Sequence, residues 1–315
     1  MEGLTSLYAA PDAQIHRHNF NNKNDIFEVA EISRSSVDWA TATAACRFLQ
    51  KSEAELMPWV GCQALNNRPF TRLVLVPLIS NTNPYTLDIK ESVVKQLLKD
   101  FNLDLVYRFA HASGMTFDVI PIHESGAIKG FHCSIYLTDY FGLYVVYDQT
   151  RNLTQGICWA GDKLMPRLRE ALMHLRDLSY HPYYILVATA AAFISYHNLR
   201  LVKVHREVSA VEKRTGYQGW DMIAHPTAQG SFPSLSASMS GLATSLAANK
   251  RLDRLTNEML SAALDDQILD LQDMDQQARA LFQGHIQALQ RRVHVQQMHI
   301  KLCLSRVQNQ LTAVS

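Results

Sequence analysis

The chain has 315 residues, 47% of them hydrophobic, so it is long enough to bury one large core or two ordinary ones. Its 30 Lys and Arg nearly balance its 29 Asp and Glu, which argues against a dedicated nucleic-acid-binding protein, because such proteins usually carry a basic excess. The five cysteines are scattered and show no Cys-x-x-Cys pair, which argues against a disulfide framework or zinc site and favours a reducing, cytoplasmic location.

The first 69 residues form an N-terminal segment whose structure the pattern does not define, apart from a helix expected from about Ser36 to Glu55. The pattern sharpens after Thr71. The apolar run from Arg72 to Ile79 predicts a strand, in which Pro77 indicates an edge or a strand end. A helix is expected over Asp88–Asp100, because its apolar residues recur with helical spacing.

Further strands are expected along residues 70–180. Leu103–Phe109 is one, and the runs Gly130–Leu137 and Gly142–Asp148 predict an antiparallel hairpin because a short glycine-bearing loop separates them. Strands alternating with helices are typical of an α/β domain. We therefore expect residues 70–180 to form a mixed sheet flanked by helices.

Residues 181–315 are expected to be helical. The most apolar stretch, Tyr183–Tyr196, has only 14 residues, whereas a membrane span needs about 20, so a buried helix after Pro182 is expected and no transmembrane segment. This helix is predicted to continue to about Lys213. A loop is predicted at about 224–241, which is rich in Ser, Pro, Gly and Ala.

The carboxyl end predicts one very long amphipathic stalk helix. From Leu260 onward, apolar side chains fall in a band about 80° wide on one face of a helix. Such a helix would be on the order of 80 Å long, and no stop signal precedes Ser315. An apolar band of this length needs neighbouring helices, from the same chain or another, to cover it.

Several short fragments carry a family resemblance. They are Gly142-Leu-Tyr-Val-Val-Tyr-Asp-Gln-Thr150 with Thr154-Gln-Gly-Ile157, His181-Pro182, Val211-Glu-Lys-Arg-Thr-Gly216 and Leu304-Ser-Arg-Val-Gln-Asn-Gln-Leu311. Together with the order of the expected elements, they resemble the cytosolic part of CorA-like divalent metal-ion transporters, above all the fungal branch of that family. The resemblance covers roughly Thr71 to Ser315.

The resemblance implies a soluble cytosolic domain with its stalk helix, without the transmembrane helices and the Gly-Met-Asn motif that follow in the family. It also implies a homo-oligomer formed through the C-terminal helix, since family members are homopentamers, and regulation by Mg²⁺. Carboxylates suit Mg²⁺ as ligands, and Asp266, Asp270 and Asp273 would share one side of the stalk helix. These three are the predicted metal ligands, although a solvated acidic face explains the same pattern.

Near the carboxyl end, a basic group would suit anionic lipid head groups, so a peripheral membrane contact is expected there; ordinary surface charge is the alternative. Its members are Arg291, Arg292, His294, His299, Lys301 and Arg306. The glutamines Gln296, Gln297, Gln308 and Gln310 interrupt or flank the apolar band and either set the register of a helix bundle or lie at its margin.

Catalysis is not expected. His132, Cys133 and Asp148 suggest a thiol triad, but Cys133 lies inside a predicted strand, so a buried structural cysteine is favoured. No phosphate-binding, dinucleotide-binding or hydrolase motif is present.

Three functions remain open from the sequence. The first is a non-catalytic binding, regulatory or oligomerisation module that senses Mg²⁺. The second is a truncated piece of a full-length CorA-like magnesium transporter, and the third is an enzyme or accessory protein on an α/β scaffold with no identifiable site. No cofactor other than Mg²⁺ is implied.

Overall fold

The computed structural model describes residues 19–35, 43–61, 70–79, 86–113, 115–125, 127–137, 140–215, 232–265 and 275–314. The chain forms two compact units. The sheet unit comprises Met1–Thr189 with Ala262–Gln283, and the helical unit comprises Ala190–Ser261 with Gly284–Ser315.

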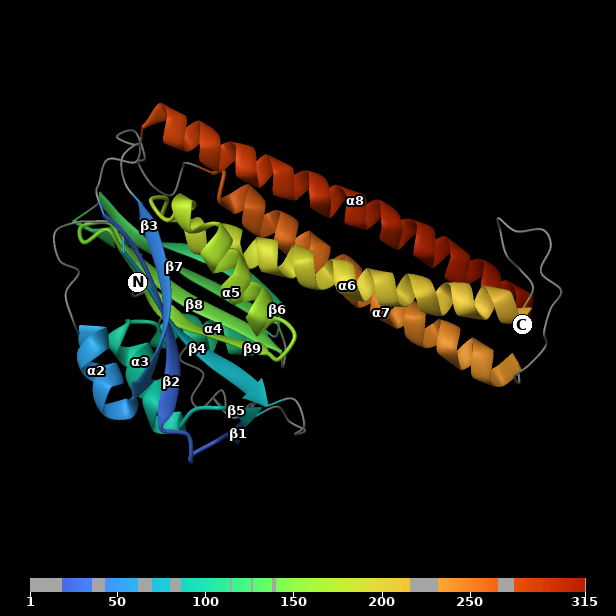
Figure 1. The fold of residues 1–315 in the computed structure, drawn as a ribbon, viewed down its shortest axis with the longest axis horizontal. Coiled ribbons are helices and arrows are strands. Elements are labelled where there is room, and N and C mark those ends of the chain that lie inside the picture. The colour runs from blue at the N-terminus through green and yellow to red at the C-terminus, as the bar shows by residue number, and fades with distance from the viewer. Residues whose placement is uncertain are drawn as a thin grey trace. The chain divides into compact units, whose positions relative to one another are not determined.

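The described residues of the sheet unit form nine strands in one mixed sheet (Figure 1). The strands are β1 (Asn19–Phe20), β2 (Ile26–Arg34), β3 (Ala44–Ser52), β4 (Phe70–Ile79), β5 (Thr86–Leu87), β6 (Met115–Glu124), β7 (Ala127–Leu137), β8 (Phe141–Asp148) and β9 (Leu153–Gly161). The order is β1-β5-β4-β9-β8-β7-β6, and β2 also pairs with β4. The β4–β9 and β1–β5 pairs are parallel, and the other pairs are antiparallel.

This sheet confirms the predicted fold class and the β7–β8 hairpin. It also brings in the N-terminal segment, because β2 pairs with β4 and carries β3. The predicted helix between Ser36 and Glu55 is wrong where the structure describes it: Ala44–Ser52 is the strand β3, and α2 (Glu53–Gly61) begins only after it. A nine-residue ladder with β2 outweighs the weak helical pattern of this segment.

Two helices, α3 (Glu91–Asp100) and α4 (Asp104–Ser113), cover one face of the sheet. The strand predicted for Leu103–Phe109 is therefore wrong. Leu103, Val106, Tyr107 and Ala110 are all buried, with the three- and four-residue spacing of a helix that rests one side on a sheet. The run was too short for its period to be distinguished from that of a buried strand.

The other face of the sheet is buried as well. Phe131 of β7 stacks on Tyr183 with ring centroids 4.8 Å apart, just before α6 (Tyr184–Thr215) begins. The short elements α5 (Met165–His174) and the 3₁₀ helix η2 (Arg176–Leu178) precede it. Both faces of β7 are thus removed from water.

Three long helices make up the helical unit: most of α6, α7 (Phe232–Ala262) and α8 (Gln276–Val314) (Figure 1). Their shared core draws on all three helices. It contains Leu201, Val204, Val208 and Val211 of α6, Leu235, Met239, Leu242 and Leu246 of α7, and Ile300, Cys303 and Val307 of α8. The apolar band of α8 in this unit is therefore covered by helices of its own chain.

The C-terminal helix is long, as predicted, but it starts later. Helix α7 ends at Ala262 with a turn at residues 263–264, and α8 begins at Gln276, so its 39 residues span about 60 Å instead of 80 Å. Asp275 caps α8, since its Oδ1 accepts hydrogen bonds from the backbone N–H of Gln277 and Ala278. The segment 232–241, which was predicted as loop, belongs to α7, where Pro233 occupies the first turn and needs no hydrogen-bond partner for its nitrogen.

Among the described helices, only α6 is long and apolar enough to cross a membrane. Most of its apolar stretch is buried inside the protein. Tyr184, Val187, Ala188 and Ala190 are among the residues that are nearly inaccessible.

Candidate functional site

The predicted metal ligands Asp266, Asp270 and Asp273 lie outside the described residues. Asp265 and Asp275, which flank them, are exposed. Within the described ranges, no three His, Cys, Asp or Glu side chains gather in a way that could hold a metal ion. The magnesium site therefore stays a prediction.

The thiol triad is not assembled. Cys133 is fully buried, and burial raises the pKa of its thiol far above neutral, so no thiolate nucleophile forms there. Its neighbour His132 points to the opposite face of the strand, as alternation requires. Asp148 is used locally, since its Oδ1 accepts hydrogen bonds from the backbone N–H of Thr150 and Arg151. Cys133 is a structural cysteine, as the sequence favoured.

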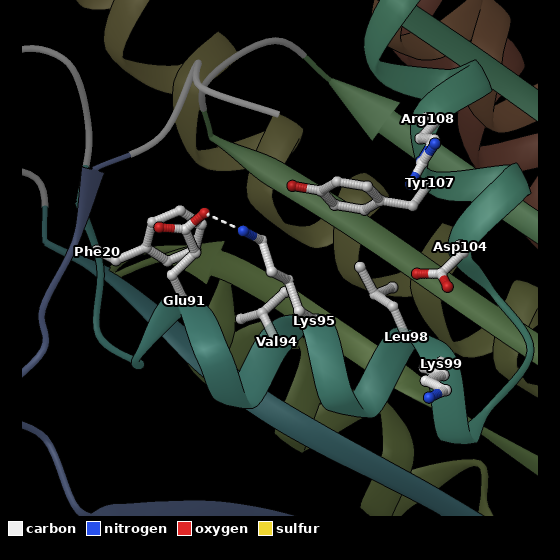
Figure 2. A pocket seen from close by; sticks show the side chains of 9 residues that line it. All are labelled: Phe20, Glu91, Val94, Lys95, Leu98, Lys99, Asp104, Tyr107 and Arg108. Carbon is white, nitrogen blue, oxygen red and sulfur yellow. Dashed lines mark ion pairs between the residues drawn. The ribbon is translucent and has the colours of Figure 1, made fainter. Parts of the chain in front are cut away.

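A groove of about 400 Å³ lies between α3 and α4 in the sheet unit. Figure 2 shows its lining: Phe20, Glu91, Val94, Lys95, Leu98, Lys99, Asp104, Tyr107 and Arg108. Glu91 and Lys95 of α3 form an ion pair of 2.8 Å, and Asp104 and Tyr107 of α4 point toward the space between the two helices. Both charge signs meet over an apolar floor, without a group placed as a nucleophile.

A second groove, of about 470 Å³ and mostly apolar, lies between α6 and α8 in the helical unit. Its lining is Asn198, Leu199, Leu201, Val202, His205, Arg206, His299, Leu302 and Cys303. Leu199 and Leu302 are 54% and 50% exposed, which is unusual for leucines that meet at one groove. Val202, Val295 and Met298 are exposed on the same two helices. We call these five exposed residues the open apolar strip.

Polar contacts hold α6 and α8 together beside this groove. The guanidinium of Arg306 donates to both carboxylate oxygens of Glu212, at 2.8 and 2.5 Å, and also to Ser209 Oγ at 2.9 Å. Its Nη1 lies 2.9 Å from His205 Nδ1. Hydrogen bonding to Glu212 raises the pKa of Arg306, so the guanidinium stays charged. The groove is consequently built on two helices in a fixed register.

These contacts bear on the predicted membrane contact of the basic group near the carboxyl end. Arg306 is committed to Glu212 and is largely covered, so it is not available to lipid head groups. The other five members are exposed, and a membrane contact through them stays a prediction.

Two of the four glutamines lie inside the bundle, where they fix the register of α8 against α6. The Nε2 of Gln296 donates to the backbone oxygen of Ile194 at 2.8 Å, and the Oε1 of Gln310 accepts from Thr215 Oγ1 at 2.6 Å. Gln296 and Gln310 are 3% and 2% exposed, so they belong to the core and not to its margin.

A buried polar contact between α6 and α7 was not anticipated. His197 Nδ1 lies 2.5 Å from Asp253 Oδ1, and His197 Nε2 lies 3.1 Å from Asn249 Oδ1. All three residues are at most 1% exposed. The sequence held a signal, because Asn249 and Asp253 fall on the same helical stripe as Leu242 and Leu246. Such a contact permits one alignment of the two helices.

No family model matches the chain, and no curated protein sequence matches it. Among solved structures, the chain is similar to the soluble domain of CorA from Methanocaldococcus jannaschii, with a TM-score of 0.45 and 11% sequence identity. The match covers 88% of this chain and 95% of that chain. A similarity of this size does not establish kinship.

Proposed function

We propose that this chain is a CorA-like cytosolic domain without catalytic activity, which associates with copies of itself through the outer face of α6 and α8. The resemblance of its short fragments to that family motivates the first half of the proposal. The second half rests on one observation, the open apolar strip.

The strip holds most of the large apolar residues that are exposed in the described part of the chain. Nine large apolar residues are exposed in the described part of the chain, and five of them form the strip on α6 and α8 of the helical unit. Scattered exposed leucines need no explanation, but three of these residues, Leu199, Val202 and Leu302, line one groove, which is typical of a protein–protein contact.

A second copy of the chain is the occupant that fits best. Val295, Met298 and Leu302 recur every three or four residues and form a ridge along α8. The groove between α6 and α8 is the kind of surface into which a helical ridge packs. One face therefore offers both the ridge and the groove, which is what association between identical chains requires.

Association is tested by sedimentation of the purified chain. We expect an oligomer for the wild type and a monomer for Val202→Ser combined with Leu302→Ser, because both changes remove apolar contact area at the groove. Leu105→Ser is the matched control: Leu105 is 49% exposed, but it lies on α4 in the sheet unit, so this variant should remain an oligomer. A monomeric wild type would refute association, and loss of the oligomer in the control would refute this interface.

Magnesium sensing by Asp266, Asp270 and Asp273 is a finer part of the proposal, and its support is the acidic pattern of the sequence. Sedimentation with and without Mg²⁺ should show a shift that the triple Asp→Asn variant loses. An oligomer indifferent to Mg²⁺ would remove sensing and leave association intact.

A further inference from the structure

The last two strands at one end of the sheet, β7 and the edge strand β6, carry a polar face that is covered where it would ordinarily face solvent. On β7, His132 and Ser134 alternate with Phe131 and Cys133. On the edge strand β6, Asp118 lies directly opposite Ser134 and Ile120 opposite His132. In an antiparallel sheet such alternation usually directs the polar residues to solvent. Here α4 packs on both β6 and β7, so these side chains lie beneath a helix.

Several polar atoms on this face are buried without a hydrogen-bond partner, among them Asp118 Oδ2, His132 Nε2 and Ser134 Oγ. His132 is 5% exposed and Ser134 is fully buried. An unsatisfied buried polar group destabilises the fold, and folded proteins rarely keep one without a bound water, ion or ligand. Three such atoms at neighbouring positions indicate that one bound species completes them.

The chemistry of the three atoms limits what that species is. The Nε2 atom of His132 has no partner, and in a neutral imidazole a ring nitrogen without a proton offers a lone pair. Asp118 Oδ2 is an acceptor when ionised, and Ser134 Oγ also carries lone pairs.

We propose that Asp118, His132 and Ser134 bind a divalent transition-metal ion of the Zn²⁺ or Mn²⁺ class between β6, β7 and α4. A set that includes an imidazole nitrogen favours such ions over Mg²⁺, which prefers oxygen ligands alone. The site has only one carboxylate and one imidazole, so hydroxyl groups and water complete the coordination. The hydroxyl of Thr116, two residues from Asp118 on the same face, is the nearest further oxygen in the sequence.

Because Asp118 lies on the edge strand β6, an ion can reach the proposed site from solvent. Helix α4 covers the interior side, but β6 pairs with β7 alone, and Asp118 is only half-buried. Exchange with solvent therefore needs no opening of the sheet. This site is independent of Asp266, Asp270 and Asp273, and of the association proposed for α6 and α8.

The test is a titration of the metal-free full chain with Co²⁺ and Zn²⁺, followed by Co²⁺ absorption, calorimetry and thermal unfolding. We expect one strong site per chain and a higher unfolding temperature with metal. Asp118→Asn and His132→Gln should each weaken binding at least about tenfold, and Ser134→Ala less. Asp162→Asn and His123→Gln change exposed residues of the same types and should bind as the wild type does.

The variants and a competing ion distinguish the outcomes. Retained near-ultraviolet circular dichroism shows that a variant is folded. If Asp118→Asn or His132→Gln unfolds, metal binding by Ser134→Ala is compared with that of the wild type instead. Binding that is unaffected in the folded variants would overturn the site, as would the absence of a strong site. Displacement of Co²⁺ by Mg²⁺ at tenfold excess would overturn the assigned class of ion.

Discussion

The covered and the open faces of α8 use apolar residues for different purposes. Ile300 and Val307 are 1% exposed and pack against α6 and α7, whereas Met298 and Leu302, each two positions from Ile300, are about half exposed. The covered face stabilises the bundle through burial of apolar area. The open face gains little from folding of the single chain, and this is the face through which we propose that two copies associate.

The largest expected loss of stability comes from a substitution on the covered face of α8. Ile300→Asp should destabilise the helical unit by more than about 4 kcal/mol, because it removes apolar burial and places an unpaired carboxylate in the core. Leu302→Asp, two residues away and half exposed, should change the stability of the monomer by about 0.5 kcal/mol or less. Urea unfolding followed by circular dichroism measures both. Equal losses would mean that the two faces do not differ as described.

A smaller loss is expected when the polar contact between α6 and α8 is broken. Glu212→Gln leaves Arg306 without its carboxylate partner in a largely covered place, and should cost about 2–3 kcal/mol. The control is Glu207→Gln, which removes the exposed Lys203–Glu207 pair and should cost about 0.5 kcal/mol or less. Chemical denaturation of both variants tests the difference, and a similar cost for the two would contradict a structural role of Arg306.

The start of α8, in the sheet unit, predicts a stability that depends on pH. His181 stacks on Phe282 with ring centroids 3.5 Å apart, and burial, helped by Arg279, lowers its pKa to about 3. Because the folded-state pKa is depressed, the contribution to stability is complete above about pH 6.5 and is lost as the pH falls toward 3. At pH 5, which is about 1.5 units below the pKa of an unfolded-state histidine, the free energy of unfolding should be lower by about 2 kcal/mol, at about 1.4 kcal/mol per pH unit.

His181→Phe keeps an aromatic ring against Phe282 and should flatten this acid limb in unfolding experiments at several pH values. His174→Phe changes an exposed histidine of α5 and should leave the limb in place. If the His181 variant loses stability with acid as steeply as the wild type does, other groups govern the acid transition.

Sequence periodicity predicted much of this fold because it reports which side of an element is apolar. The β7–β8 hairpin, the strand over residues 72–79 and the long C-terminal helix follow from such local patterns. Leu103–Phe109 was misassigned because a run this short fits the period of a strand and of a helix alike. The Ser36–Glu55 helix failed because pairing with β2, a non-local contact, decides the conformation of Ala44–Ser52.

The candidate sites were harder to predict. The open apolar strip is invisible in the sequence, because Leu302 and Val307 are both apolar positions on one helix and only the packing of α6 distinguishes them. The polar face of β7 has the alternation of a solvent-facing strand, and nothing local indicates that α4 covers it. The contact of His197 with Asp253 joins residues 56 apart in the sequence.

The sequence by itself determined the apolar band of α8, the mixed sheet and the helical character of the second half, since each depends on the spacing of neighbouring residues. Only the tertiary structure decided that α6 and α7 cover this band, that α4 closes over β6 and β7, and that one face of α6 and α8 is left apolar and exposed. The physical reason is that burial depends on contacts between segments distant in the chain, and a local pattern specifies which face needs a cover without specifying what provides it.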